Sequence, residues 1–327
     1  MSDPGRALAV RVKRTAKRFR GTGPGQAVEA GVNELWFQRD RAARRRQYPR
    51  LDIPPVDETV RLLRRDGFAV LPGVGDLDAL ARLAREFDAC LSAGRHLNRP
   101  THDAIRPAGE TAEASALVSD DDIAGGEERL RHLTNYLSVD EPFVACPAAV
   151  ELAFTPLLLR IAGAYLGCPP AVGGVNLRRS FVNDLTEFDT LFFHSDPNSP
   201  RFLKFFFYLN DVDEGGGPFA YIPGTHRQKF RGWRRKYRWT PEEIETIYPG
   251  RVRLATARVG DLVIADTTGF HRGTKVVTRD RTMLTVNMVV HREFHGRQVG
   301  FKLPRAATTG FTPAQQAGTD FLDLVDS

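Results

Sequence analysis

Seven short apolar runs, separated by turn residues, fill the second half of the chain and constrain its fold more than any other feature. They read AVGGVNLRRSFVN (171–183), TLFFHSD (190–196), FLKFFFYLN (202–210), FAYIPG (219–224), RVRLATA (251–257), DLVIADT (261–267) and RTMLTVNMVVHREF (281–294). Gly, Pro, Asn and Asp separate them, as is typical of short strands. The pattern predicts a sandwich or barrel of antiparallel strands over about residues 171–295. A basic, aromatic insertion at 227–250 interrupts it and ends in a helix capped by Thr240.

Helices are expected before this β-rich region. Apolar spacing and end signals predict a short helix stopped by Gly67, a strand at 68–71, a helix from the Asp76 cap to Gly94, and a helical segment at 147–166 broken at Pro156. Residues 95–130 are polar and rich in turn formers, so we expect a long loop there. The acidic triplet 120–122 would be a solvated part of that loop. The fold class is therefore mainly β with flanking helices.

The excess positive charge lies at the N-terminus. Residues 1–50 hold 13 Lys or Arg and four Asp or Glu, a net charge of +9, whereas the whole chain carries +6. We expect residues 1–55 to form a basic, helical extension that lies on the domain or on a partner subunit. A nucleic acid or a membrane surface is the alternative partner, although no motif of a nucleic-acid-binding fold accompanies the charge. Residues 56–300 would form the main domain, followed by a C-terminal tail at 301–327.

Composition favours a cytoplasmic protein. The chain is 42% hydrophobic and 26% charged, which is ordinary for a globular protein. Its three cysteines form no CxxC pair and no disulfide framework. We expect no signal peptide in the first residues and no run that approaches the roughly 20 apolar residues of a membrane span.

A histidine and an aspartate share one of the apolar runs, LFFHSDPNSP at 191–200. In a strand, His194 and Asp196 would point to the same face, where an imidazole and a carboxylate can bind a divalent metal. His271, just after the run at 261–267, offers a third ligand. Two histidines and one carboxylate form the facial triad of non-haem Fe(II) oxygenases, which leaves other metal positions open.

Two cations accompany these residues. Lys204 lies in a run that is apolar on both faces, where an unpaired ammonium is costly unless an anion meets it. Arg281 opens a long apolar strand, and its planar guanidinium can take a carboxylate in bidentate fashion. They predict that a small dicarboxylic keto acid is clamped at one end and chelates iron at the other. The alternative is that both cations form ordinary surface contacts.

The motifs HSD, YLNDVDEGGGPFAYIPGTHR and GDLVIADTTGFHRG, followed by Arg281, resemble the phytanoyl-CoA dioxygenase family of Fe(II)/2-oxoglutarate oxygenases. RDGFAVLPGV and LLRIAGAYLG are similar to that family as well, so the likeness covers roughly residues 60–300. It implies a double-stranded β-helix, a cupin-like jelly roll, as the core. It also implies the iron ligands His194, Asp196 and His271, and 2-oxoglutarate contacts from Arg281, Lys204 and Asn183. Lys204 stands where some members have a small hydroxyl residue.

The resemblance further implies the reaction. Dioxygen and 2-oxoglutarate would give succinate, carbon dioxide and an iron-bound oxidant at His194, Asp196 and His271 that removes hydrogen from an unactivated C–H bond. Hydroxylation is the expected outcome, while desaturation, cyclisation and epimerisation remain open. A non-catalytic jelly-roll protein that binds an acidic ligand and a nucleic-acid-directed oxygenase are the alternatives.

The substrate is expected to be a small molecule. A secondary metabolite, a glycan precursor or an acyl- or carrier-linked compound fits a basic and aromatic rim over the cavity, which could bind phosphate, carboxylate or sugar groups. The candidate substrate contacts are Arg178, Arg179, Arg272 and Trp233. A solvated helix face is the alternative interpretation of the insertion.

Overall fold

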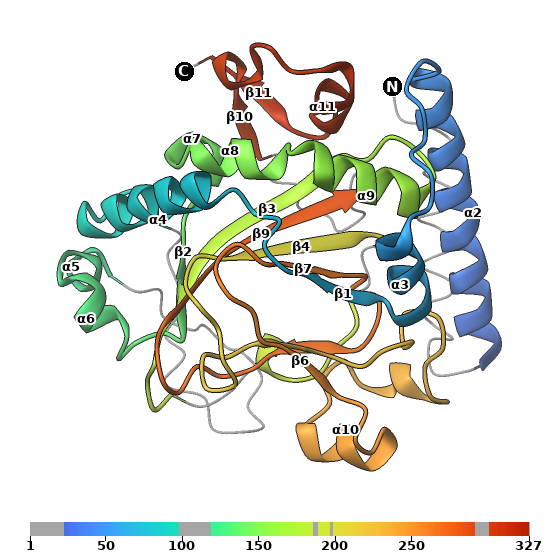
Figure 1. The fold of residues 1–327 in the computed structure, drawn as a ribbon. Helices are drawn as coiled ribbons and strands as arrows, with labels where there is room; N and C mark the ends of the chain where they lie inside the picture. The colour runs from blue at the N-terminus through green and yellow to red at the C-terminus, as the bar shows by residue number, and fades with distance from the viewer. Residues whose placement is uncertain (1–22, 98–118, 186–188, 197–198, 292–300, 327) are drawn as a thin grey trace.

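The computed structural model describes residues 23–97, 119–185, 189–196, 199–291 and 301–326 (Figure 1). Its centre is a six-stranded antiparallel sheet of strand order β1-β7-β4-β9-β3-β2. In that order the strands are Phe68–Leu71, Leu262–Ala265, Leu203–Tyr208, Arg281–Val289, Ala171–Ser180 and Tyr136–Ser138. A second, three-stranded sheet has the order β6-β5-β8, with strands Arg253–Ala255, Phe219–Tyr221 and His271–Gly273. Large antiparallel sheet and flanking helices agree with the predicted fold class.

Side-chain alternation along the strands builds two separate layers of core. On β4, Phe205 and Phe207 belong to the core beneath the helices, whereas Phe206 and Tyr208 belong to the core between the two sheets. Phe206 meets Phe219 of β5 there, with ring centroids 4.7 Å apart. Residues at alternate positions of a strand point to opposite faces, so one short sequence serves both layers. The layer between the sheets is the one that can hold a site.

Helices cover the outer face of the large sheet (Figure 1). The helices before β3 are α3 (Glu58–Asp66), α4 (Leu77–Ser92), α5 (Asp120–Ala124), α6 (Gly126–Leu130), α7 (Pro142–Ala145), α8 (Ala148–Ala153) and α9 (Pro156–Leu166). Gly67 ends α3 with φ 78°, and the Asp76 carboxylate caps α4, as the sequence predicts. The prediction of a loop at 120–122 is wrong. These residues start α5, because Ser119 and Asp122 form a capping box.

The segment 148–166 needs a second correction. It is long and apolar enough to pass for a membrane span, with a mean hydropathy of 1.4, although we expected no such run. However, 72% of its most apolar window is buried inside the molecule. The segment forms the core helices α8 and α9, broken at Pro156 as predicted. A cytoplasmic location stays a prediction.

The C-terminal residues are folded and do not form the expected tail. They comprise β10 (Lys302–Pro304), η4 (Arg305–Thr308), α11 (Pro313–Gly318) and β11 (Asp323–Val325). Leu303, Ala317 and Leu322 are buried, and Leu303 and Leu322 join the core beneath the helices. The apolar residues of this segment thus pack into the core, which could not be predicted from the sequence because they are few and far apart.

The N-terminal helix α2 (Gly23–Gln47) docks on this C-terminal segment through Arg44, whose side chain is 4% exposed. Its guanidinium donates to the main-chain oxygens of Pro169 (2.6 Å), Pro170 (3.1 Å) and Ala317 (2.9 Å) and to Asp320 Oδ2 (2.9 Å). Part of the predicted extension is therefore a helix attached to the domain, while residues 1–22 lie outside the described residues.

The insertion carries η3 (Trp233–Arg235) and α10 (Pro241–Ile247). The predicted capping box is confirmed: the Thr240 hydroxyl accepts from the Glu243 amide, and the Glu243 carboxylate accepts from the Thr240 amide. Aromatic residues of the insertion pack on Phe193 and Phe270, which anchors it beside the three-stranded sheet.

We expect Arg44→Met to lower the free energy of unfolding by about 3 kcal/mol, because buried carbonyls and Asp320 lose their common donor. Chemical denaturation followed by circular dichroism measures this. Arg46→Met removes the same charge from an exposed position of α2 and should change stability by less than about 0.5 kcal/mol. Equal effects of the two substitutions would contradict the docking role of Arg44.

Candidate metal centre

A main-chain bridge joins the two candidate histidines. The His194 amide donates to the His271 carbonyl at 2.9 Å, and the His271 amide donates back at 3.0 Å. The Asp196 amide donates to the Thr267 carbonyl at 2.9 Å. These hydrogen bonds attach the segment at 194–196 to the chain entering β8, so that residues about 75 positions apart in the sequence meet.

The expected strand over 190–196 does not form as such. Within this run the structure has the end of the 3-10 turn η2 (Asp189–Leu191) and isolated bridges at 193 and 194. The alternation of side chains in a strand therefore does not by itself explain why the His194 imidazole and the Asp196 carboxylate lie together. The bridge to His271 supplies the missing part.

The three side chains converge on a small, buried space. The Asp196 carboxylate lies 3.6 Å from His194 Nε2 and 3.5 Å from His271 Nε2. One ligand atom from each residue lies within 4.8 Å of the others, and this is the group of possible metal ligands found among the described residues. Each imidazole Nδ1 lies at hydrogen-bond distance from a main-chain oxygen, Phe192 at 2.9 Å and Gly269 at 3.0 Å. This contact fixes the tautomer that leaves Nε2 free to bind a metal.

Burial sets the charge states that a metal requires. Desolvation lowers the pKa of His271 to about 3 and also lowers the pKa of His194, so both rings are neutral at physiological pH. Burial, the largest single effect, would raise the pKa of Asp196, but the attraction of Lys204, His271 and His194 and the hydrogen bond from Lys204 together outweigh it and hold that pKa well below its usual range. Two neutral imidazoles and one carboxylate are the donors of a facial non-haem iron site. The residues present therefore fit Fe(II).

Comparison with known families decides the affiliation of the chain. The family model described as phytanoyl-CoA dioxygenase (PhyH) matches residues 63–283. The chain belongs to this family. Fe(II) and 2-oxoglutarate are the cofactors of the family, and His194, Asp196 and His271 supply the matching metal donors. No curated protein sequence matches the chain.

Several solved structures are similar at low identity. SnoN, an epimerase from nogalamycin biosynthesis, in complex with Fe3+, alpha ketoglutarate and nogalamycin RO, is 18% identical, with 70% of this chain and 81% of that chain covered and a TM-score of 0.49. HygX from Streptomyces hygroscopicus, with nickel, 2-oxoglutarate and hygromycin B bound, is 15% identical, with 72% of this chain and 87% of that chain covered and a TM-score of 0.48. EctD from S. alaskensis, with 2-oxoglutarate and 5-hydroxyectoine, is 18% identical, with 73% of this chain and 78% of that chain covered and a TM-score of 0.49.

An inner cavity of about 540 Å³ lies between the sheets and reaches from the histidines to Arg281. Arg281 is 3% exposed, and its Nη2 donates to Ser180 Oγ at 3.2 Å. Desolvation, together with the charge of Arg178, lowers the pKa of Arg281 to about 10. Neither guanidinium forms an ion pair with a carboxylate of the described residues. Arg178, expected at the substrate rim, instead lines this inner cavity.

Lys204 also lines the inner cavity, but its charge is already compensated. Its Nζ lies 2.7 Å from Asp196 Oδ2. The sequence argument that this buried ammonium requires an external anion is therefore corrected, because the anion is part of the chain. A contact between Lys204 and 2-oxoglutarate stays a prediction.

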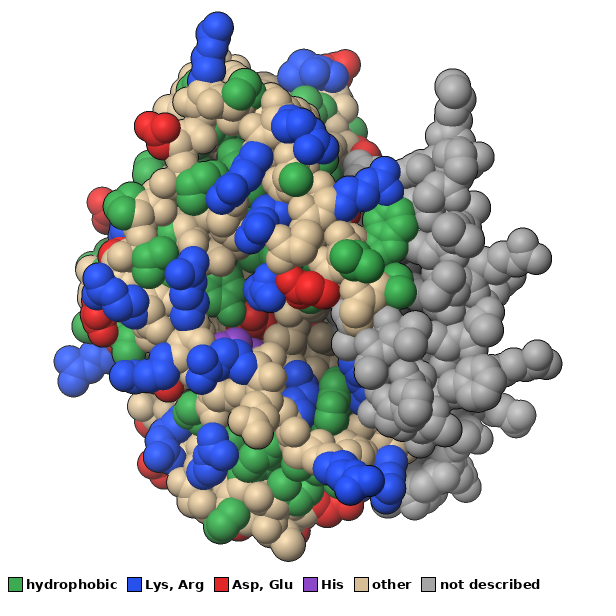
Figure 2. All heavy atoms as spheres, turned by 90° about the vertical axis from the view of Figure 1, so that its right-hand side faces the viewer, with side chains coloured by type: hydrophobic (Ala, Val, Ile, Leu, Met, Phe, Trp, Pro, Cys, Tyr) green, Lys and Arg blue, Asp and Glu red, His purple; other side chains and the backbone are tan. Residues whose placement is uncertain are grey.

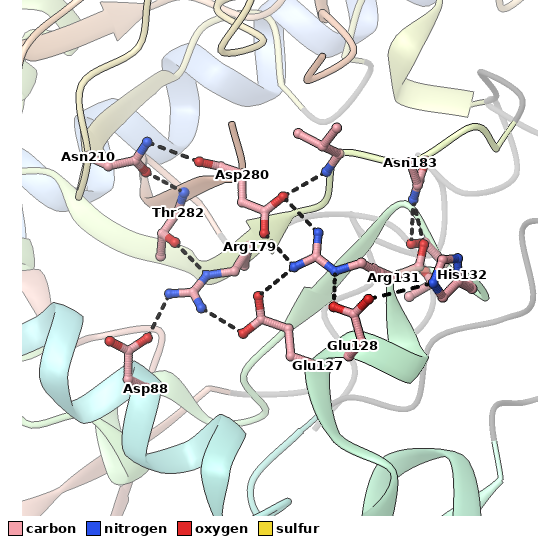
Figure 3. Close-up of polar contacts among 12 residues, drawn as sticks. Asp88, Glu127, Glu128, Arg131, His132, Arg179, Asn183, Asn210, Asp280 and Thr282 are labelled. Atoms are coloured by element: carbon pink, nitrogen blue, oxygen red, sulfur yellow. Dashed lines mark hydrogen bonds and ion pairs between the residues drawn. The ribbon is translucent and has the colours of Figure 1, made fainter. Parts of the chain in front are cut away.

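Asn183 is not among the residues that line the inner cavity, and its side chain is hydrogen-bonded elsewhere (Figure 3). Its Nδ2 donates to the main-chain oxygens of Arg131 and Thr134, both at 3.0 Å, and its Oδ1 accepts from the Leu185 amide at 3.2 Å. Donor and acceptor are thus occupied by neighbouring loops. The structure corrects the expectation that this amide contacts 2-oxoglutarate and shows that it ties loops together.

Arg179 is the second residue that points elsewhere (Figure 3). Its guanidinium donates to Asp88 Oδ1 at 2.6 Å, Glu127 Oε2 at 2.9 Å and Thr282 Oγ1 at 2.9 Å. It follows Arg178 in β3, and adjacent residues of a strand point to opposite faces. The expectation that both arginines contact substrate is therefore wrong for Arg179.

An outer cleft of about 1420 Å³ lies on the other side of the metal position, with His194 and Asp196 in its wall. Trp233 lines it, as expected. Arg272 does not: its Nη1 donates to the Leu191 carbonyl at 3.0 Å, and it borders a separate depression beside α10. Figure 2 shows the mouth of this cleft, where Lys and Arg side chains surround a hollow in which a histidine is visible.

Sequence reasoning missed one wall of this cleft. Arg41 of α2 and Arg64 of α3 line it, as does Lys229 of the insertion. The basic composition of the insertion was a signal for Lys229. No local pattern distinguishes Arg41 or Arg64 from the other arginines of their helices, because their role depends on tertiary packing.

We expect His271→Ala to weaken Mn(II) or Fe(II) binding by about 100-fold or more, since even the loss of an outer contact to a ligand costs about 10- to 100-fold. Titration followed by electron paramagnetic resonance of Mn(II) measures the affinity. His226→Ala is the control, because His226 lines the outer cleft, as His194 does, but is not one of the three grouped ligands, and its Nε2 lies 3.2 Å from the Arg64 carbonyl. Equal losses in both variants would contradict the assignment of the ligands.

Proposed function

We propose that the chain is an Fe(II)/2-oxoglutarate-dependent dioxygenase that hydroxylates an unactivated C–H bond of a small molecule. The observation that carries this is the position of the His–Asp–His group between two cavities. His194 borders both cavities, whereas His271 borders the inner one and Asp196 the outer one. A metal held there would meet a cosubstrate from one side and a substrate from the other. The two facing sheets would then be the jelly roll of the family.

The inner cavity would hold 2-oxoglutarate. Arg281 and Arg178 offer guanidinium donors at its far end, where a distal carboxylate would compensate their buried charges. When bound, iron and 2-oxoglutarate supply the oxidation: substrate, dioxygen and 2-oxoglutarate become hydroxylated substrate, succinate and carbon dioxide. The chain itself would orient the ligands and exclude water from the site. The ring centroids of Phe219 and His271 lie 5.4 Å apart, and Phe219 also packs against Phe206. These two phenylalanine rings would keep water from this side of the metal.

Desaturation, cyclisation and epimerisation use the same metal and cosubstrate, and the ligand set is equally compatible with them. A non-catalytic protein that binds an acidic ligand is the second candidate function. The observation in its favour is the excess of cations in both cavities, which does not itself require iron.

Anaerobic addition of Fe(II) and 2-oxoglutarate tests the proposal directly. We expect the visible charge-transfer band of the chelate in the native chain and its loss in Asp196→Ala, because that variant lacks the carboxylate ligand. Succinate release under oxygen then reports turnover. A correctly folded, metal-loaded chain without the band would contradict the oxygenase proposal and favour the binding protein.

The affinity for 2-oxoglutarate tests the arginine clamp. We expect Arg281→Met to weaken binding by about 10- to 100-fold, because a charge-assisted hydrogen bond contributes about 1.5–3 kcal/mol. Lys204→Met should weaken it less, since Asp196 already compensates that lysine. Arg179→Met is the control, as this neighbour of Arg178 points to the outer face. An equal effect of Arg179→Met would show that the losses reflect general destabilisation.

A further inference from the structure

The outer cleft gathers cations from separate parts of the chain. Among the described residues, eight Lys or Arg and three Asp or Glu line it. Its volume of about 1420 Å³ exceeds the roughly 300–1,000 Å³ of most ligand sites. The metal position lies in its wall, so a molecule that fills the cleft reaches the reacting centre. Figure 2 shows how the basic side chains surround the hollow.

The three acidic residues of the cleft do not balance its eight cations, although Glu243, outside the cleft, pairs with Lys236. Glu34 pairs with Arg201 at 3.1 Å. Asp196 belongs to the metal site. Asp266 is 1% exposed and accepts a hydrogen bond from the Tyr165 hydroxyl at 2.6 Å. The cleft therefore keeps a net positive charge, and an anionic ligand would remove the cost of holding these cations together.

Lys229 shows this cost most clearly. Its Nζ lies 4.8 Å from the centroid of the Trp233 ring, and no carboxylate of the described residues forms an ion pair with it. Burial lowers the pKa of Lys229 to about 8, an effect that the charge of Asp266 opposes and the charge of Arg234 aids. An anion bound beside Lys229 would restore its positive charge and gain a strong electrostatic contact.

Two arginines that line the same cleft are linked to this lysine through His226. Arg227 and Lys229 both act on His226 and help to lower its pKa, after the larger effect of burial. His226 in turn contacts the main chain of Arg64, whose Nη2 donates only to the Ala164 carbonyl at 3.1 Å among the described residues. Three cations from two separate segments thus line the cleft, and none of them forms an ion pair with a carboxylate of the described residues, although Asp266 acts on Lys229 from a longer distance.

This arrangement suits a phosphate better than a carboxylate. One guanidinium can saturate a carboxylate with two parallel hydrogen bonds, as proposed for Arg281 in the inner cavity. A phosphate ester carries a charge of about −1.5 to −2 and three acceptor oxygens that point in different directions. Cations on several sides of the cleft match that geometry.

We propose that the substrate is a phosphate ester whose phosphate group is bound by Lys229, Arg64 and Arg227. This inference rests on the proposed function, because the reacting carbon of the same molecule would lie at the metal position. The phosphate group only binds and orients the substrate and is not removed. The reaction remains the insertion of one oxygen atom into a C–H bond, with 2-oxoglutarate as the co-reductant. A small molecule fits better than a nucleic acid, because the cations surround a cleft that contains the metal position and do not form a stripe along an exposed face.

Calorimetric titration of the full chain, loaded with Fe(II) and 2-oxoglutarate without oxygen, tests this. The probes are two matched pairs, uridine 5′-diphosphate with uridine and 4′-phosphopantetheine with pantetheine, together with inorganic pyrophosphate. We expect pyrophosphate and at least one phosphorylated partner to bind, and the partner without phosphate to bind at least about tenfold more weakly. A parallel titration of metal-free protein excludes binding of the probe to iron.

The variants give the decisive comparison. Lys229→Met should weaken pyrophosphate binding by about tenfold or more, since a charge-assisted contact is lost. Arg235→Met removes a cation from the same insertion at an exposed position that does not line the cleft, and it should leave binding unchanged. The chelate band confirms that each variant is folded around its cofactors.

Four results would overturn one claim or the other. Absence of phosphate binding in protein that shows the chelate band would remove this inference and leave the proposed function intact. Equal binding to Lys229→Met would do the same. Tighter, strongly salt-dependent binding of a single-stranded oligonucleotide would make the cleft a nucleic-acid site. Phosphate binding without any chelate band would retain the anion site and remove the oxygenase proposal.

Discussion

The paired main-chain hydrogen bonds between His194 and His271 are the interaction on which the site depends. They join a segment without regular strand structure to β8, and both imidazoles then face the carboxylate of Asp196. Main-chain contacts at each Nδ1 fix the rings further. Because backbone atoms determine this geometry, the side chains around the metal position are free to serve the two cavities.

Positive charge that is partly or wholly shielded from water connects the two cavities. The inner cavity holds Arg178 and Arg281 without a carboxylate partner in the described residues, and the outer cleft holds Lys229 in the same state. Desolvation lowers the pKa of each of the three side chains. A chain selected for stability alone would pair or remove such charges. Their retention is expected where ligands supply the missing anions, one on each side of the metal.

Side-chain alternation, helix-capping spacing and short motifs made much of the fold and of the metal site predictable from the sequence. Alternation in FLKFFFYLN fixes which residues of β4 face each core layer, and the Thr240–Glu243 capping box follows from spacing alone. The HSD motif and the later histidine predicted the metal ligands, which the structure brings together. Asn183 could not be judged from sequence, because loops distant in the chain occupy its amide. The walls of the outer cleft also depend on tertiary packing, and the neighbours Arg178 and Arg179 were separated only once β3 and its face were known.

The docking of α2 through Arg44 has a consequence for how the outer cleft of this chain can change. The helix that bears Arg41 in the cleft is held by the C-terminal segment, while the candidate metal ligands belong to other elements. Helix α2, held in place by the C-terminal segment, therefore forms one wall of the cleft, apart from the elements that bear the candidate metal ligands. Changes in α2 can reshape the cleft while the candidate metal ligands stay as they are, so the range of molecules that the cleft admits and the chemistry of the metal position can change separately.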